Sequence, residues 1–335
     1  MVERRKTMIS AAVLLLVVVA AVLFAAVSKK QKAEYPVETH NGIAMGTVVS
    51  VKIFNETPTA LSNQVMGVID ALEQEISWRV ETSPVAELNR TGRCNSKTAA
   101  DAVNACLPIC AATNGAFDLT VGKVRALWDF GGENERLPSA DEISDALRTV
   151  DFQTLEAAGD TVSCVAGQQL DLGAVGKGLA CDKVEKYLSA LGVKGAVVSV
   201  GGSICAFGSR NKAADPWRVA IKHPRKENAL LGTIRLKEGF VSTSGDYEKF
   251  FEQDGRRYFH ILDARTGYPA ETGLCSVTVV CNNGLLSDAL STACFLLGKE
   301  KSEPLLEQYD AAAVFVTEDG KVSTFGNVDF TAYES

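Results

Sequence analysis

Three segments of the sequence combine residue types that could bind phosphate, hold a cation or move a proton. The first contains Asp171, Ala174 and Lys177 among interleaved glycines and leads into an expected helix over 177–191. Glycines let the backbone approach a ligand closely, and a helix N-terminus beside a lysine attracts anions. The spacing is neither a Walker A loop nor a GxGxxG fingerprint. The segment therefore predicts either a phosphate site or a glycine-rich junction with a surface lysine.

The second segment places a carboxylate and a hydroxyl on one helix face. Asp288 and Thr292 are four residues apart in an expected helix over 286–297, so they point the same way. Both supply the hard oxygen ligands that Mg²⁺ prefers. The alternative is an exposed Asp and Thr near a helix start, where both residue types are common.

The third segment delivers a histidine to a turn. An expected strand over 258–262 carries His260 toward Asp263 and a turn that ends at Gly267. Histidine is the side chain best able to take a proton near neutral pH, and the chain has only three. His260 is therefore a candidate base, or else a structural residue bonded to Asp263.

The elements that must position these residues indicate an α+β fold with mixed or antiparallel sheets and packed helices. Strands outnumber helices and adjoin one another without regular βαβ alternation. The strands are expected at 47–54, 196–200, 217–221, 232–236, 258–262, 276–281, 312–316 and 321–325, with a hairpin joining the last two. Further helices are expected from about 58 to 76 and from about 99 to 113.

Composition argues against nucleic acid as a partner and does not by itself decide whether the cysteines form disulfides. The net charge of −7 over 335 residues, with no basic stripe after residue 32, argues against nucleic acid. Nine cysteines cannot all pair within one chain, and no CxxC motif points to zinc. Buried thiols are favoured over disulfides.

The N-terminal residues predict a membrane anchor. A basic tail at 1–7 precedes an uncharged, largely apolar run over 8–27, and about 20 residues suffice to cross a bilayer. A cleaved signal peptide is the alternative, but its apolar stretch is usually only about 7–15 residues. We expect a single-pass protein of the cell membrane, with a cytoplasmic tail, a linker over 28–39 and an extracytoplasmic folded domain over 40–335.

Several short motifs together resemble a known family. Their order looks like that of the FAD:protein FMN transferases, the ApbE family, and covers nearly all of the chain after the apolar run. The motifs are MGT at 45–47, FDLTVG at 117–122, LDLGAVGKG at 170–178, GGSI at 201–204, VSTSGDY at 241–247, HILDARTG at 260–267 and SDALST at 287–292.

The resemblance implies roles for individual residues. The positions matching those that hold FAD are Met45, Trp78, Ala116, Phe117, Asp118, Asp171, Lys177, Ile261 and Leu262. Of these, Trp78 would cover a ring of FAD, or else it is ordinary core packing at a helix end. The positions matching the magnesium site are the Ala174 carbonyl, Asp288 and Thr292, and His260 matches the histidine beside the pyrophosphate.

The implied activity is Mg²⁺-dependent transfer of FMN from FAD to a Thr or Ser hydroxyl of an acceptor protein, with release of AMP. An FAD pyrophosphatase giving FMN and AMP, and a non-catalytic FAD-binding surface protein, are the alternatives. The implied partners are FAD, the acceptor protein and the membrane.

The sequence departs from the family pattern in a few places. No cysteine follows the apolar run, so a lipid-modified N-terminus is not expected. Ala264 stands where proline is commoner, and Ser203 replaces a frequent asparagine, which puts the hydrogen bond of that amide in doubt.

Overall fold

The structure is a computed structural model that describes residues 34–333. The predicted anchor over 8–27 lies outside the described residues and stays a prediction. Between residues 34 and 333, no helix is both long and apolar enough to cross a membrane.

An antiparallel sheet of eight strands forms the centre of the protein, in the order β1-β2-β6-β7-β10-β15-β16-β17. Alternation builds it locally: in β2, Val49, Val51 and Ile53 are buried on one face, as the period of two predicts. The strands are β1 (Val37–Ala44), β2 (Thr47–Phe54), β6 (Gly195–Val200), β7 (Ser203–Gly208), β10 (Gly239–Gly245), β15 (Leu274–Cys281), β16 (Ala312–Thr317) and β17 (Val322–Phe325).

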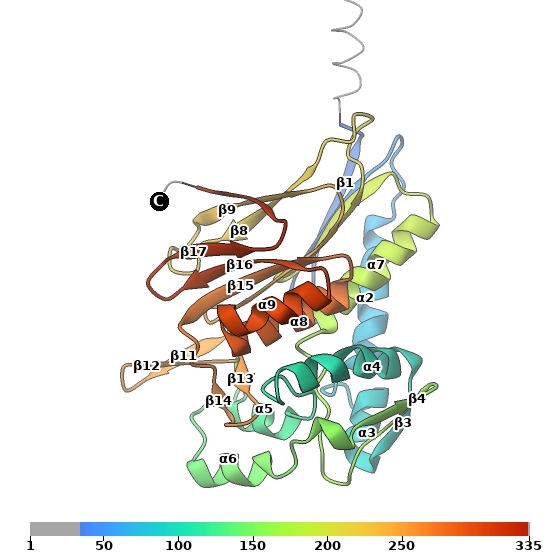
Figure 1. Cartoon of the computed structure of the whole chain (residues 1–335). Helices are drawn as coiled ribbons and strands as arrows, with labels where there is room; N and C mark the ends of the chain where they lie inside the picture. The colour runs from blue at the N-terminus through green and yellow to red at the C-terminus, as the bar shows by residue number, and fades with distance from the viewer. Residues whose placement is uncertain (1–33, 334–335) are drawn as a thin grey trace, which may run out of the picture.

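The two faces of this sheet are covered differently (Figure 1). A smaller sheet in the order β18-β9-β8 covers one face and encloses an apolar cluster with Val241 and Val314. Helices cover the other face and share the main core with it. The covering elements are β8 (Trp217–Lys222), β9 (Leu230–Leu236), β18 (Asp329–Ala332), α2 (Ser62–Ile76), α4 (Lys97–Ala112), α7 (Gly176–Ala190), α8 (Gly284–Leu297) and α9 (Lys299–Gln308).

Shorter elements gather at one end of this layered body, in the lower part of Figure 1. Trp128 is fully buried there, stacked on Phe130, and donates from Nε1 to the carbonyl of Gly267. The elements are α3 (Pro84–Thr91), β3 (Arg93–Asn95), α5 (Gly122–Trp128), α6 (Ala140–Leu147), a 3₁₀ turn (Phe152–Thr154), β4 (Glu156–Ala158), β5 (Thr161–Ser163), β11 (Phe250–Gln253), β12 (Arg256–Phe259), β13 (Leu262–Asp263) and β14 (Tyr268–Pro269).

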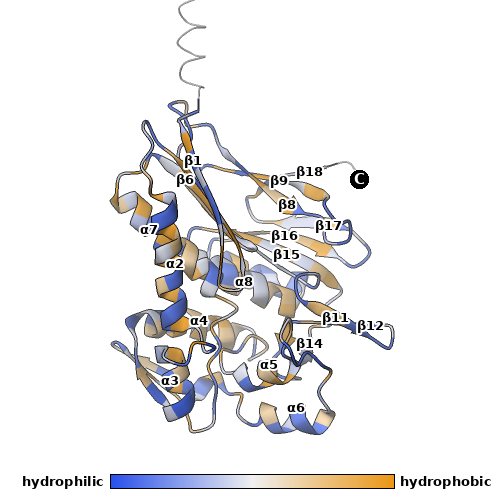
Figure 2. Ribbon diagram, turned by 180° about the vertical axis from the view of Figure 1, so that it is seen from behind, coloured by the Kyte–Doolittle hydropathy of each residue, from blue (hydrophilic) through white to orange (hydrophobic). Residues whose placement is uncertain are grey.

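Hydropathy follows this layering (Figure 2). The helix α2 carries hydrophilic residues on its outer side, whereas β15 and β16 are mostly hydrophobic because both of their faces are covered. The cysteine prediction is confirmed: all nine are free thiols, and all are buried except the half-buried Cys164.

The predicted α+β class is confirmed, but several boundaries were wrong. The strand expected over 258–262 ends at Phe259, so His260 lies in the segment between β12 and β13 and not on a strand. β1 begins at Val37, inside the expected linker, and its half-exposed edge position explains why its sequence lacks an apolar alternation. The helix expected from 58 begins at Ser62, because Glu38 accepts hydrogen bonds from the backbone N–H groups of Thr59 and Ser62 and ties that turn to β1. Within the eight-stranded sheet, the strands β1, β7 and β10 were not expected.

Candidate functional site

A cavity of about 1070 Å³ opens among the β1–β2 hairpin, the end of α2, the start of α7, α8 and the segment after β12. Every residue singled out in the sequence for FAD, magnesium or proton transfer contributes to its wall. These are Met45, Trp78, Ala116, Phe117, Asp118, Asp171, Ala174, Lys177, His260, Ile261, Leu262, Asp288 and Thr292.

The glycine-rich junction and the acidic helix meet at one wall of the cavity. A Cβ atom on Gly178 would lie 2.0 Å from the carbonyl oxygen of Gly284, so α7 and α8 touch through their backbones. Across this contact the Gly178 N–H donates to Asp288 Oδ2 over 2.7 Å. Asp182 on α7 also accepts from the first N–H groups of α8, at Gly284 and Leu285. Sequence segments more than 100 residues apart therefore form one corner.

Asp288 is buried at this corner, with only 4% of its surface exposed. Its Oδ1 accepts a hydrogen bond of 2.6 Å from Ser203 Oγ. The alternative of an exposed helix-start Asp was therefore wrong, because neighbouring strands cover this part of α8.

The oxygens near Asp288 fit a hard cation. Residues 34–333 contain no cluster of three or more His, Cys, Asp or Glu side chains able to hold a metal. Asp288 and Thr292 line this wall together with Ala174, so a carboxylate, a hydroxyl and a backbone carbonyl lie in the same part of the cavity. Such a set, completed by water and a phosphate, suits Mg²⁺.

His260 enters the cavity as a neutral imidazole. Burial, together with the nearby charges of Arg125, Lys177 and Lys249, lowers the pKa of His260 from 6.5 to about 3. Its Nδ1 is buried and has no hydrogen-bond partner among the described residues. A lowered pKa keeps the imidazole neutral at physiological pH but also weakens it as a proton acceptor. A bound diphosphate would offset the charge of the three cations and so raise this pKa.

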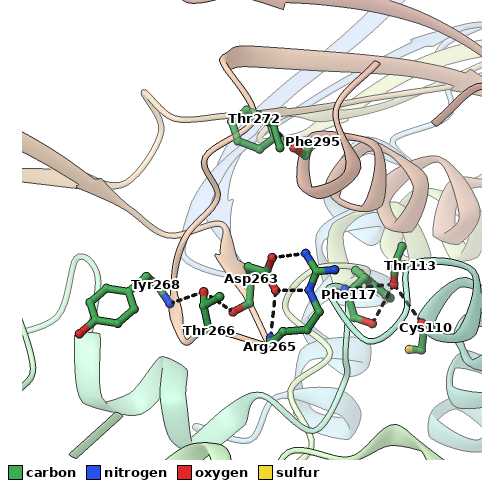
Figure 3. A network of polar contacts seen from close by, with 9 residues as sticks. All are labelled: Cys110, Thr113, Phe117, Asp263, Arg265, Thr266, Tyr268, Thr272 and Phe295. Carbon is green, nitrogen blue, oxygen red and sulfur yellow. Dashed lines mark hydrogen bonds and ion pairs between the residues drawn. The ribbon is translucent and has the colours of Figure 1, made fainter. Parts of the chain in front are cut away.

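The alternative for His260, a structural hydrogen bond to Asp263, is not found. Asp263 instead binds Arg265, through hydrogen bonds of 2.9 Å from Nε and 2.5 Å from an Nη atom (Figure 3). The turn is anchored to the neighbouring loop, because the Ala264 N–H donates to the carbonyl of Ala116 over 3.0 Å. The turn thus holds His260 beside the loop that carries Phe117.

Cationic side chains surround this histidine. Arg125, Lys177 and Lys249 all line the cavity, and burial together with the first two lowers the pKa of Lys249. Arg125 Nη1 also forms an ion pair of 2.9 Å with the buried Asp171. Clustered positive charge in a partly enclosed cavity favours a polyanion such as a diphosphate.

Two of the acidic wall residues hold the protein's own backbone. Asp118 accepts hydrogen bonds from the N–H groups of Thr120 and Phe152, and burial raises its pKa. Asp171 accepts from the Gly173 N–H over 2.6 Å, in addition to Arg125. Both carboxylates therefore shape loops that line the cavity.

One wall of the cavity is formed by the tip of the β1–β2 hairpin and by Trp78. Met45 and Gly46 both have positive φ, at 51° and 66°, in the two-residue turn between β1 and β2. Glu73 on α2 holds this turn by accepting from the Met45 N–H over 2.8 Å. Trp78 lies just beyond α2 with the guanidinium of Arg79 4.7 Å from its ring centre. The hairpin tip and Trp78 can therefore enclose a planar ring.

Comparison with known proteins identifies the family. The model of the ApbE family matches residues 45–315. The chain belongs to the ApbE family.

Named relatives and solved structures agree with this membership. An FAD:protein FMN transferase of Treponema pallidum is 33% identical over 86% of each chain, and one of Escherichia coli K12 is 31% identical over 85% of this chain and 87% of its own. The crystal structure of the ApbE protein of Thermotoga maritima superposes with a TM-score of 0.78 at 31% identity, covering 86% of this chain and 96% of that one. The apo flavinyl transferase ApbE of Pseudomonas stutzeri gives 0.76 at 35% identity, with 88% and 95% covered.

Some residues of this ApbE-family site were missed in the sequence. Arg125, Lys249 and Glu73 reach the cavity from elements that no short motif links to the phosphate segment. Arg125 meets Asp171 across 46 residues, and Glu73 meets Met45 across 28. Only the folded chain brings these pairs together, so the spacing of these residues in the sequence did not indicate that they share one site.

Proposed function

We propose that this protein is an FAD:protein FMN transferase, which moves FMN from FAD to a Thr or Ser hydroxyl of an acceptor protein and releases AMP. The relatives that carry this name match over most of both chains. The observation that carries the proposal is the shared corner at which Gly178 of the phosphate segment binds Asp288 of the acidic helix, at the wall of one large cavity.

The residues of the corner fit magnesium. Asp288, Thr292 and the carbonyl of Ala174 would hold the ion, which would offset charge on the phosphates when bound. Lys177, Arg125 and Lys249 would fix the diphosphate of FAD, since all three are cations of the same cavity.

His260 would act as the base. In the reaction the acceptor oxygen forms a bond to the flavin-side phosphorus, and the bond from that phosphorus to the oxygen of AMP breaks. The proton of the hydroxyl would pass to His260, because the charge of the bound diphosphate would offset the cations that lower the pKa of this histidine. Met45, Trp78, Phe117, Ile261 and Leu262 would contact the rings of FAD, since all five line the same cavity.

The membrane location is part of the same proposal. The length of the uncharged run over 8–27 supports a single span. Basic residues flank the run on both sides, so their distribution does not decide the orientation. The short N-terminal tail is the end that is easiest to leave in the cytoplasm, and this would place the catalytic domain outside. Protease treatment of intact cells, or of spheroplasts if an outer layer shields the protein, would test it. Degradation of the catalytic domain is expected, and full protection until lysis would contradict the orientation.

The activity is tested by incubating the full chain with FAD, Mg²⁺ and a candidate acceptor, followed by mass spectrometry of the acceptor and assay of AMP. We expect the mass of the acceptor to increase by one FMN moiety, with AMP formed in equal amount. Equal AMP formation without an acceptor would instead identify a pyrophosphatase. Retention of FAD with no AMP under any condition would identify a non-catalytic binder.

A further inference from the structure

Both side chains proposed to hold the cation are hydrogen-bonded to serines on neighbouring strands. Ser203, at the start of β7, donates from Oγ to Asp288 Oδ1 over 2.6 Å, and Ser244 Oγ on β10 lies 3.1 Å from Thr292 Oγ1. We propose that Ser203 and Ser244 are positioning residues that fix these two oxygens for a divalent cation. The inference rests on the proposed function, because it assumes that Asp288 and Thr292 bind the metal.

The carboxylate of Asp288 is fixed by one donor on each oxygen. Gly178 N–H donates to Oδ2 and Ser203 Oγ–H donates to Oδ1, with all three residues buried. Two donors on opposite oxygens set the rotation of the carboxylate. Each oxygen keeps a further lone pair, so the group can still bind a cation.

The direction of the hydroxyl of Thr292 follows from counting protons. Ser291 Oγ donates to the carbonyl of Asp288 over 2.9 Å, so its single proton is used. Its contact of 2.8 Å with Ser244 must therefore have Ser244 as donor. Ser244 can then only accept from Thr292, whose proton points at Ser244. The remaining lone pairs of Thr292 Oγ1 are left for a cation.

Histidines that bind a metal are usually oriented by a second group that hydrogen-bonds to the ring. Ser203 and Ser244 would orient the oxygen ligands Asp288 and Thr292 in the same way. Loss of such an outer partner typically weakens metal affinity by about 10–100-fold while leaving the ligands themselves in place. Removal of the Ser203 hydroxyl would leave Oδ1 of a buried carboxylate without its donor. Removal of the Ser244 hydroxyl would let the proton of Thr292 turn toward the cation site.

A matched control lies on the same strand. Ser242 Oγ lies 2.7 Å from Ser287 Oγ, and both residues are fully buried between β10 and α8. Ser287 donates to the carbonyl of Gly284, so Ser242 is again the donor to a helix hydroxyl. Ser242→Ala therefore removes the same kind of strand-to-helix bond without touching either proposed ligand.

The test compares the full-length wild type with Ser203→Ala, Ser244→Ala and Ser242→Ala. Mn²⁺ alone is titrated into each protein and followed by electron paramagnetic resonance. Binding of FAD without metal is measured by flavin fluorescence, and stability by urea unfolding. We expect Ser203→Ala and Ser244→Ala to bind Mn²⁺ about 10–100-fold more weakly than wild type. Ser242→Ala should stay within about twofold, and FAD affinity without metal should not change in any of them.

Two outcomes would overturn the inference, and a third would remove its basis. If Ser203→Ala and Ser244→Ala both bind Mn²⁺ as tightly as Ser242→Ala does, the hydroxyls of Ser203 and Ser244 do not position the ligands. An equal loss in Ser242→Ala would show a general packing effect. If the wild type itself binds no Mn²⁺ yet still transfers FMN, the metal assignment fails while the transferase proposal stands. Should an alanine variant unfold, Ser203→Thr and Ser244→Thr keep the hydroxyl and should bind Mn²⁺ within a few-fold of wild type.

Discussion

Gly178 and Gly284 face each other across the α7–α8 contact with no room for a side chain between them. A Cβ on Gly178 would lie 2.0 Å from the Gly284 carbonyl oxygen and 2.9 Å from the Cβ of Asp288, and one on Gly284 would lie 2.3 Å from the Gly178 carbonyl oxygen. Those atoms belong to the backbone or to a tightly packed side chain, so moving them would cost free energy. The proposed metal corner therefore depends on two residues that carry no functional group.

We predict that Gly178→Ala separates α7 from α8. The free energy of unfolding should fall by roughly 1–3 kcal/mol, as in other overpacked sites, and metal affinity should fall with it. Gly67→Ala on the exposed side of α2, where a Cβ meets nothing within 4 Å, is the control. It should raise stability by up to about 1 kcal/mol, since alanine favours helices. Urea unfolding measures the stability of both variants. If Gly178→Ala has the same free energy of unfolding as wild type, the close contact between α7 and α8 is contradicted.

Asp288 is predicted to be indispensable for transfer. Asp288→Ala removes the only carboxylate among the proposed ligands, so FMN transfer should be abolished at physiological Mg²⁺. Asp101→Asn, an exposed position on α4 paired with Lys97, removes one negative charge without reaching the cavity and should leave the rate unchanged. AMP release and acceptor mass measure the effect. Normal activity of Asp288→Ala would refute the assignment.

His260 should make stability depend on pH. Because its pKa is about 3 in the folded chain and 6.5 otherwise, the unfolded chain takes up the proton first as pH falls. The contribution of neutral His260 to the free energy of unfolding is therefore present above pH 6.5 and is lost as pH falls from 6.5 toward 3. Between pH 7 and 5 the loss is roughly 2 kcal/mol.

Urea unfolding of His260→Gln at these two pH values provides the measurement. The variant should lose less stability than wild type by that amount. Equal losses in wild type and His260→Gln would mean that the imidazole titrates normally. Transfer by His260→Gln should also fall at neutral pH if the imidazole is the base.

Trp78 is predicted to contribute to FAD affinity through ring stacking. Trp78→Ala should weaken FAD binding up to about tenfold, because aromatic pairs contribute about 0.5–1.5 kcal/mol beyond burial. Trp78→Phe keeps a ring and should retain most of the affinity. Flavin fluorescence titration without metal measures both variants. If Trp78→Ala binds FAD normally and only unfolds more easily, the residue is core packing.

Sequence patterns predicted the parts of the site that are local. The spacing of Asp288 and Thr292 placed both on one face of α8, and the glycines before Lys177 indicated a junction that another backbone could approach. The boundary of β2 was also predicted from its alternation. Each of these signals depends on residues within one turn or one strand.

The parts that were not predicted depend on contacts between distant residues. Ser203 stood as a departure from the family pattern, and only the fold shows its hydroxyl donating to a carboxylate 85 residues later. The charges that lower the pKa of His260 come from α5, α7 and the segment before β11. The strand β1 was missed because an edge strand needs no alternating apolar face, and its bonds to β2 carry no sequence signal.

The buried cysteines allow local unfolding of the protein to be followed by the reactivity of their thiols. Burial raises the pKa of every one of the nine thiols, so the reactive thiolate is scarce as well as hidden. An alkylating reagent added to the native protein should modify Cys164 first and the other eight only as fast as the layers part. Counting adducts over time would then record how often, and in what order, the sheet and its helices come apart.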